Sequence, residues 1–312
     1  MRVLITCPPM LRNIDGMRDR FARHGVDIDT PDVVQTLSEA ELIELVPQFD
    51  GWIIGDDPAT GRVFEAGKAG RLKAAVKWGV GTDNVDLAAA AAVGISVPNT
   101  PGMFGAEVAD VAMGYVIGLA RRLFEIDRGV RAHRWPKPTG TSLADRTVAL
   151  VGLGDVGCCA AQRLLAADMK IIGYDPAPRG DVPSAVERSV WPDRIESADF
   201  IVLTCALTAS NRHLLNAEIF ARAQRGVRIV NVARGPLIDE SALISALRDG
   251  TVSGAALDVL EEEPLPFASP LRDFENCIFG SHNASHTAEA VHRTSGRAIT
   301  LLFERLGIED RS

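Results

Sequence analysis

The chain has 312 residues, of which 46% are hydrophobic and 24% are charged. These proportions are those of a folded globular protein and exclude a disordered or fibrous class. The length exceeds the usual domain size of roughly 100 to 150 residues, so two domains are expected. The formal net charge of -8 disfavours nucleic acid as a partner, because phosphate contacts need lysines and arginines gathered on one face.

The cysteines and the apolar stretches indicate the compartment. The five cysteines form neither a CxxC pair nor any zinc-binding spacing, so we expect reduced, mostly buried thiols and no metal site. The chain opens directly on an apolar strand without a basic leader, and its longest nearly uncharged stretch, residues 111–120, is too short to cross a bilayer. We therefore expect a cytoplasmic protein with no membrane partner.

In the first hundred residues, short apolar runs alternate with helical patterns. Strands are predicted at residues 3–5, 52–54, 72–76 and 95–97. Between the first two, Ser38 and Glu41 form a capping box that predicts the start of a helix running to about residue 46. This alternation of strands and helices is typical of an α/β unit with a parallel sheet.

A second α/β unit is predicted after a proline-rich connection. Its strands are expected at residues 148–151, 171–174, 200–204, 227–232, 254–259 and 278–279. Between the two units, the helix at residues 106–123 is apolar around almost its whole circumference, so it must be covered on all sides. Either it is a core helix between domains, or part of it packs against a second subunit.

The strongest local motif is GLGDVG, which follows a predicted strand and opens a predicted helix. Gly152 permits a tight turn, Gly154 lets the backbone approach a pyrophosphate, and Gly157 lets the helix pack closely on the strand. Asp155 and Val156 lie in the same turn, where the helix N-terminus supplies N–H groups and a positive dipole. The motif in this context predicts a dinucleotide-binding turn, although a strand-to-helix turn without a ligand needs the same glycines.

Asp175 indicates which dinucleotide is bound. It ends the next predicted strand, eighteen positions after Gly157, where a carboxylate accepts hydrogen bonds from the adenosine ribose hydroxyls and repels the extra phosphate of NADP. The alternative for Asp175 is a turn residue before Pro176. Arg179 leaves room for NADP, because a guanidinium pairs with a 2'-phosphate. We predict NAD.

A dehydrogenase also needs a proton donor and a cation for an acidic substrate. Arg234 follows a predicted strand in the segment NVARGP, directly after Ala233, at the sheet edge where ligands of open α/β sheets bind. Asp258 ends the next strand and begins the acidic run DVLEEEP. Taken alone, each has a simpler interpretation, as a surface arginine and a solvated acidic loop. His282 follows the last strand, and spacing alone leaves the choice between His282 and His286 open.

Several motifs in order resemble the D-isomer-specific 2-hydroxyacid dehydrogenase family over nearly the whole chain. They are KWGVGTDNVD, VPNTPG, the glycine turn, NVARGPLIDE, GAALDVLEEEP and SHNAS. The resemblance implies that Arg234 binds the substrate carboxylate, that His282 is the acid/base, and that Glu263 pairs with His282 and favours its protonated form. It also implies that Asp258 and Ala233 belong to the cofactor site.

The same resemblance implies the domain organisation and the partners. We expect two doubly wound parallel-sheet domains: a flavodoxin-like substrate domain at residues 1–98, completed by a C-terminal helix at 286–312, and a Rossmann NAD-binding domain at 99–285. The backbone N–H groups of Val80 and Gly81 are expected to help bind the substrate carboxylate. The helix at 106–123 is expected in a homodimer interface.

The expected function is hydride transfer between NAD(H) and C2 of a small 2-hydroxy or 2-keto acid. Two alternatives stay open: a non-enzymatic NAD-sensing module, and a formate or phosphite dehydrogenase on the same fold. Asp56 and Asp57 follow a predicted strand of the first domain, where they could lie near the tail of the substrate. If both border the active-site mouth, they disfavour a phosphorylated tail by repulsion; the alternative is that both face water and cap the following helix.

Overall fold

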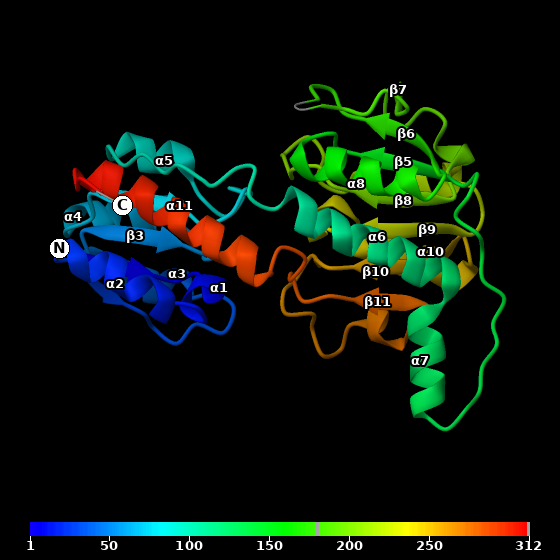
Figure 1. Cartoon of the computed structure of the whole chain (residues 1–312), viewed down its shortest axis with the longest axis horizontal. Helices are drawn as coiled ribbons and strands as arrows, with labels where there is room; N and C mark the ends of the chain where they lie inside the picture. Colours follow the sequence, from blue (N-terminus) through cyan, green and yellow to red (C-terminus); the bar gives the residue numbers. More distant parts are fainter. Residues whose placement is uncertain (179–180, 311–312) are drawn as a thin grey trace. The chain divides into compact units, whose positions relative to one another are not determined.

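A computed structural model describes residues 1–178 and 181–310. The chain divides into two compact units, the first made of residues 1–103 and 286–312 and the second of residues 104–285. Each unit is an open α/β sheet with helices on both faces (Figure 1). Arg179, the residue that leaves room for NADP, lies outside the described residues.

The first unit contains a four-stranded, all-parallel sheet in the order β2-β1-β3-β4. The strands are β1 (Arg2–Ile5), β2 (Asp27–Asp29), β3 (Gly51–Ile54) and β4 (Ala74–Lys77). The α-helices are α1 (Pro8–Leu11), α2 (Asp15–Arg23), α3 (Glu39–Leu45), α4 (Gly61–Ala69), α5 (Leu87–Ala92) and α11 (Ala288–Leu306). The C-terminal helix α11 packs on β3 and β4, which returns the end of the chain to the first unit.

The core of this unit follows from local sequence signals. All four residues of β3 and of β4 are buried, as expected of strands covered on both faces. On one face, Leu42 of α3 and Phe64 of α4 pack with Trp52 of β3 in a single apolar cluster. The predicted capping box is confirmed: the Ser38 hydroxyl accepts a hydrogen bond from the Glu41 N–H, and the Glu41 carboxylate accepts one from the Ser38 N–H.

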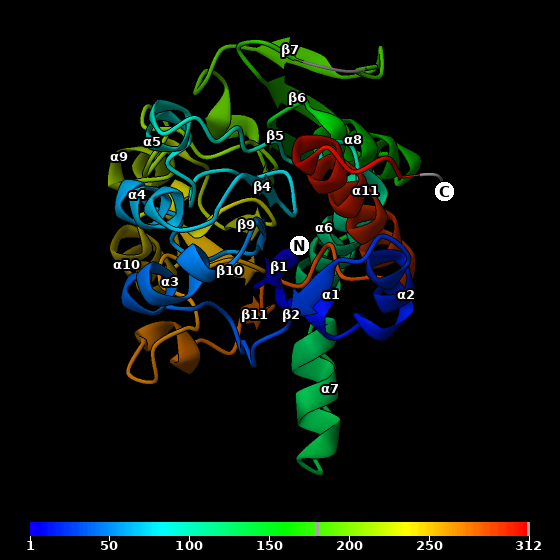
Figure 2. The same ribbon diagram turned by 90° about the vertical axis from the view of Figure 1, so that its left-hand side faces the viewer.

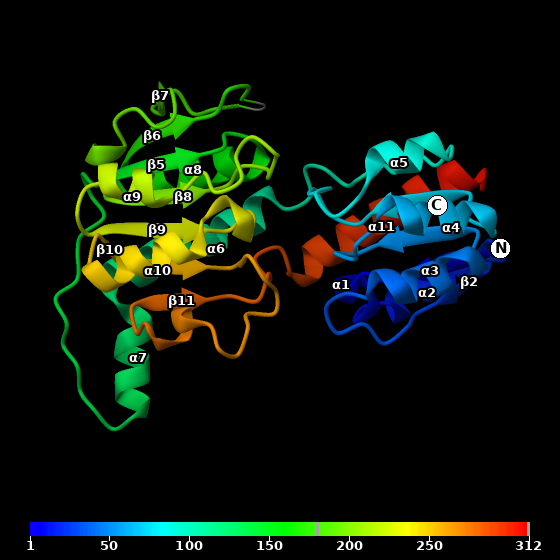
Figure 3. The same cartoon turned by 180° about the vertical axis from the view of Figure 1, so that it is seen from behind.

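The second unit contains a seven-stranded, all-parallel sheet in the order β11-β10-β9-β8-β5-β6-β7. Its strands are β5 (Thr147–Val151), β6 (Lys170–Tyr174), β7 (Glu187–Ser189), β8 (Phe200–Leu203), β9 (Val227–Asn231), β10 (Val252–Leu257) and β11 (Cys277–Phe279). The α-helices are α6 (Gly105–Arg121), α7 (Leu123–Arg131), α8 (Asp155–Ala166), α9 (Ala217–Arg222) and α10 (Glu240–Asp249). Helices α6 and α8 cover one face (Figure 1), and α9 and α10 cover the other (Figure 3). Helix α7 stands away from the sheet (Figure 2).

The predicted parallel α/β architecture is confirmed, with three differences. The strand expected at residues 95–97 does not form: Ile95 is buried, but its N–H bonds to the Ala90 carbonyl at the end of α5. The edge strands β2 and β7 were not predicted, because their sequences, DID and ERS, lack an apolar run. Helix α6 is not covered on all sides within the chain, because Ala106, Asp110 and Gly114 are exposed along one face.

The described residues also bear on membrane insertion and on the state of the cysteines. No helix among them combines the length and apolarity needed to span a membrane. The five cysteines are free thiols, three of them buried and two partly buried. Burial raises the pKa of Cys205 and of Cys277 to about 11, so neither is a reactive thiolate near neutral pH.

Candidate active site

The carboxyl edge of the seven-stranded sheet gathers most of the residues that the sequence singles out. The glycine turn follows β5, Asp175 follows β6, Arg234 comes three residues after β9, Asp258 directly follows β10, and His282 comes three residues after β11. All these strands are parallel, so their carboxyl ends lie on the same side. Ligands of open α/β sheets bind at this edge.

The glycine turn fits a bound pyrophosphate. Gly152 has a φ of 98°, and a Cβ there would lie 2.6 Å from the Cys205 nitrogen. A Cβ on Gly157 would lie 2.0 Å from the Gly152 carbonyl oxygen. These two glycines are therefore required by the fold itself. A Cβ on Gly154 would meet nothing within 4 Å, so the protein leaves open space at the residue where a phosphate would approach the N-terminus of α8.

Asp175 is held beside that turn. Its Oδ2 atom accepts a hydrogen bond of 2.7 Å from the Leu153 N–H, and its Oδ1 atom accepts one of 2.8 Å from the Ala177 N–H. The carboxylate is therefore fixed next to the glycine turn and partly exposed. This is the position that a carboxylate needs to bind ribose hydroxyls.

His282 and Glu263 form a close pair. The Nδ1 atom of His282 lies 2.8 Å from the Oε2 atom of Glu263, and about a quarter of each side chain is exposed. The other carboxylate oxygen, Oε1, accepts a hydrogen bond of 2.9 Å from the Leu260 N–H. Glu263 is thus anchored to its own loop while it orients the imidazole. A histidine oriented by a carboxylate in this way is suited to proton transfer through Nε2.

Asp258 fixes the backbone around His282. Its carbonyl accepts a 2.7 Å hydrogen bond from the His282 N–H, and its carboxylate accepts bonds from the Asn283 and Ala284 N–H groups at 3.2 and 2.9 Å. His282 has a φ of 56°, in the left-handed region that few residues other than glycine adopt. The hydroxyl of Tyr115 on α6 lies 3.4 Å from the buried carboxylate. Asp258 is therefore a support of the histidine loop, a role that the sequence did not indicate.

Arg234 lies in a tightly packed turn. A Cβ on the next residue, Gly235, would lie 1.8 Å from the Leu260 carbonyl oxygen, so the turn touches the backbone of the loop that carries Glu263. The Arg234 carbonyl accepts a hydrogen bond of 2.8 Å from the Asn231 side chain, and the guanidinium donates one of 2.8 Å to the Ala233 carbonyl. These contacts bring the predicted carboxylate-binding arginine and the predicted acid/base pair into adjoining loops of one unit.

Val80, Gly81 and His286, which the sequence singles out for the active site, lie in the first unit. Val80 and Gly81 follow β4, and the Val80 carbonyl accepts a 2.7 Å hydrogen bond from Asn99; their role in binding a carboxylate stays a prediction. His286 stacks edge-on against Trp78, with ring centroids 6.4 Å apart. Of the two histidines that spacing left open, it is His282 that lies against a carboxylate at the sheet edge of the second unit.

The expectation for Asp56 and Asp57 is corrected. Asp57 is fully buried and accepts hydrogen bonds from the Thr6 hydroxyl and from the N–H groups of Leu37 and Gly55. Asp56 lies 2.9 Å from the buried ammonium of Lys77. Asp57 neither borders an opening nor faces water, and the charge of Asp56 is balanced. The predicted repulsion of a phosphorylated substrate would therefore rest on Asp56 alone, which is 42% exposed and paired with Lys77, and it stays a prediction.

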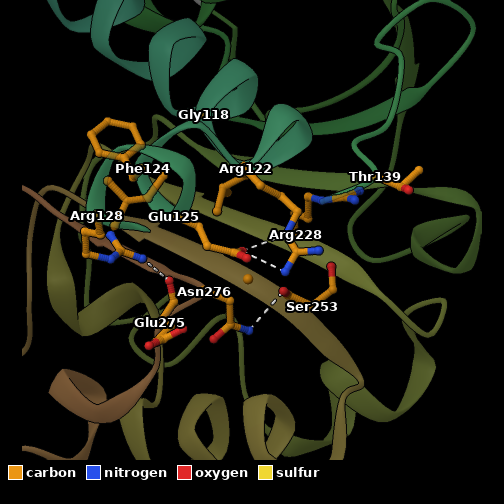
Figure 4. A pocket seen from close by; sticks show the side chains of 13 residues that line it. Gly118, Arg122, Phe124, Glu125, Arg128, Thr139, Arg228, Ser253, Glu275 and Asn276 are labelled. Carbon is orange, nitrogen blue, oxygen red and sulfur yellow. Dashed lines mark hydrogen bonds and ion pairs between the residues drawn. The ribbon is translucent and has the colours of Figure 1, made fainter. Parts of the chain in front are cut away.

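A pocket of about 520 Å³ lies at the opposite, amino edge of the seven-stranded sheet (Figure 4). Phe124 and Arg128 of α7 line one wall, and Arg228 near the start of β9 lines another. Arg122 forms an ion pair of 2.7 Å with Glu125 at its rim. None of the predicted catalytic or cofactor-binding residues lines this pocket.

Comparisons with known proteins identify the family and the fold. Residues 113–284 match the family model described as D-isomer specific 2-hydroxyacid dehydrogenase, NAD binding domain. A glyoxylate reductase of Thermofilum pendens is 38% identical over 85% of this chain and 81% of its own length, and a hydroxypyruvate reductase of Thermotoga maritima is 37% identical over 87% and 90%. Among solved structures, the D-lactate dehydrogenase of Escherichia coli superposes with a TM-score of 0.83, at 27% identity, over 100% of this chain and 99% of that one.

Proposed function

We propose that this chain, which belongs to the D-isomer specific 2-hydroxyacid dehydrogenase family and contains its NAD-binding domain, interconverts a small 2-keto acid and its D-2-hydroxy acid. The observation that carries the proposal is the Glu263–His282 pair, which lies at the same sheet edge as the glycine turn. The names of the two relatives make glyoxylate and hydroxypyruvate the first substrates to test.

The residues of the second unit have distinct parts in this reaction. NAD(H), when bound, supplies or accepts the hydride at C2 of the substrate. The turn Gly152–Gly157, with Asp155 and Val156, would hold the pyrophosphate, Asp175 the adenosine ribose, and Ala233 and Asp258 would border the nicotinamide. The fit of the turn rests on the open space at Gly154.

The substrate is handled by Arg234, His282 and Glu263. The Arg234 guanidinium would bind the substrate carboxylate as a bidentate partner and orient its carbonyl. In the reductive direction, the Nε2 atom of His282 would donate a proton to the C2 oxygen as negative charge develops there, and in oxidation it would accept that proton. Glu263 holds Nδ1, which sets the tautomer of the neutral ring and favours the imidazolium that donates.

The test is an assay of NADH oxidation with glyoxylate, hydroxypyruvate, pyruvate and 3-phosphohydroxypyruvate, run together with NAD⁺ reduction by formate and by phosphite. We expect turnover with at least one of the 2-keto acids. The product should have D configuration wherever C2 becomes a stereocentre, which excludes glycolate from glyoxylate. Tight NADH binding without turnover of any compound would instead support an NAD-sensing module. Turnover of formate or phosphite alone would assign the fold to that chemistry.

We further propose a cytoplasmic homodimer. Free cysteines are typical of a reducing compartment. The proposed dimer surface consists of the exposed side of α6 and the apolar residues that follow it. These residues are 43 to 77% exposed: Leu123, Phe124, Val130 and Trp135. Light scattering should give twice the chain mass. A Phe124→Ser, Trp135→Ser variant should be monomeric, and an unchanged mass in the variant would move the interface elsewhere.

A further inference from the structure

Glu263 is not the only glutamate of its loop that holds a histidine. Two residues earlier, Glu261 lies with its Oε1 atom 2.6 Å from the Nε2 atom of His213. The two histidines also share an unusual backbone, because His213 has a φ of 53° and His282 a φ of 56°. A histidine in the left-handed region needs surrounding contacts to hold it there. One acidic loop therefore anchors two constrained histidines, of which the proposed reaction uses one.

Glu261 also contacts Glu240 at the start of α10. The Glu261 N–H donates a 2.7 Å hydrogen bond to the Oε1 atom of Glu240 in the first turn of α10, and the Glu240 N–H donates one of 3.3 Å to the Oε2 atom of Glu261. Burial raises the pKa of Glu240, and the neighbouring carboxylates Glu261, Glu262 and Glu263 add to that rise. The Arg212 guanidinium, 3.4 Å from Glu261, offsets this crowding of negative charge, and a ring nitrogen of His213 lies 2.6 Å from the same carboxylate.

The network also reaches the turn that carries Arg234. The His213 N–H donates a 2.8 Å hydrogen bond to the carbonyl of Pro236, two residues after Arg234. On the other side of the turn, Gly235 packs directly against the Leu260 carbonyl. The Leu260 N–H is the donor that anchors Glu263. The peptide between Leu260 and Glu261 is thus fixed from both sides, by the arginine turn and by Glu240.

We propose that His213 and Glu240 are positioning residues of the active site. Through Glu261 they hold the Glu263–His282 pair in a fixed position relative to the turn that carries Arg234. This inference rests on the proposed function for its kinetic consequence. Neither residue is placed against the substrate or the cofactor. The contact between His213 and Glu261 is partly shielded from solvent, with side-chain exposures of 38 and 25%.

The experiment compares His213→Ala, His213→Gln and Glu240→Gln with the wild type. The control is His24→Ala, which removes another histidine–carboxylate pair, the 3.1 Å contact between His24 and Asp310 in the first unit. We expect His213→Ala to lower kcat about tenfold, because loss of a hydrogen bond to a charged group allows the loop to shift. NADH affinity should be unchanged. His213→Gln keeps a donor for Glu261 and should recover most of kcat. His24→Ala should have the kcat of the wild type.

A second readout does not depend on turnover. The pH at which half of His282 is protonated, followed by NMR of its ring protons, should fall in His213→Ala and in Glu240→Gln, because Glu263 no longer lies against the imidazole as firmly. A purely structural role would lower the melting temperature and leave both kcat and this titration unchanged, and that result would overturn the proposal. If the wild type reduces no 2-keto acid, the proposed function fails, while the His282 titration still decides whether the network exists.

Discussion

The two sheets of this chain are both parallel, yet the groups at their carboxyl edges differ in one respect: the second edge holds a histidine–carboxylate pair. In the first unit, Asp57 is fully buried and satisfied by the donors around it, and Lys77 is buried against Asp56. In the second unit, Glu263 and His282 keep about a quarter of their surface exposed while they contact each other. Buried charge supports the fold at both edges, because Asp258 in the second unit is buried as well. The second edge adds a partly exposed pair of titratable groups within hydrogen-bond distance of each other.

The largest effect that tests this contrast is expected at His282. His282→Ala removes the proposed proton donor and should lower turnover by about a hundred- to ten-thousandfold, the usual range for a general acid, while NADH binding and the melting temperature survive. Steady-state kinetics and NADH fluorescence measure the two quantities. The matched variant is His286→Ala, and if it caused the larger loss, the assignment of the acid/base would move to His286.

The next effect belongs to the first unit and falls on stability. Asp57→Ala would leave the Leu37 and Gly55 N–H groups and the Thr6 hydroxyl without their acceptor inside the protein. We expect the free energy of unfolding to fall by about 2 to 4 kcal/mol. Urea denaturation measures it, with Asp15→Ala as control, because Asp15 is 93% exposed. If the two variants were equally stable, buried Asp57 would contribute no more to the free energy of unfolding than an exposed aspartate does, which would contradict its role in the fold.

A smaller effect concerns pH. Burial alone would raise the pKa of Asp50, but the Arg2 N–H and the cations Lys73 and Arg71 outweigh it and lower the pKa from 3.8 to about 2. A lowered folded-state pKa means that the ionised Asp50 stabilises the protein fully above pH 3.8 and loses this contribution as pH falls through 2. The contribution is about 2 kcal/mol. Asp50→Asn should therefore flatten the fall of stability between pH 4 and 2, and an unchanged slope would contradict this account.

The smallest effect is expected at Asp175. Asp175→Ala should weaken NADH binding about tenfold, through lost hydrogen bonds to the ribose, and narrow the preference for NADH over NADPH. Asp175→Asn removes the negative charge but keeps an oxygen that can accept the hydrogen bond from the Leu153 N–H. This variant therefore distinguishes the effect of the charge on cofactor binding from the effect of a changed local structure. Fluorescence titration with both cofactors measures these preferences. A wild type that already prefers NADPH would show that another residue selects the cofactor.

Apolar runs and local turn chemistry were enough to predict most of the fold. Strand β5, TVALV, and the capping box at Ser38 have signals contained in a few adjacent residues. The polar strands β2 and β7 were missed because each forms one edge of its sheet, where backbone pairing on one side suffices and burial is slight. Ile95 shows the converse: it is buried by its side chain without joining a sheet.

The residues of the site could be predicted from the sequence only where they belong to a recognisable motif. The glycine turn is local in sequence, and resemblance supplied the pairing of Glu263 with His282 that the structure places at 2.8 Å. No local pattern connects His213 with Glu261, because 48 positions separate them. Likewise, the burial of Asp57 depends on Thr6 and Leu37, which lie on distant elements, so sequence spacing could not distinguish it from Asp56.

The position of the transferred hydride in the product decides whether this chain reduces a 2-keto acid at C2 with NADH. The protein is incubated with a 2-keto acid that it turns over and with NADH carrying two deuterium atoms at nicotinamide C4, and the product is analysed by mass spectrometry and chiral chromatography. We expect one deuterium at C2 of the 2-hydroxy acid, and D configuration when the substrate is hydroxypyruvate or pyruvate. A product without deuterium at C2, or the absence of any product with glyoxylate, hydroxypyruvate and pyruvate, would contradict this expectation.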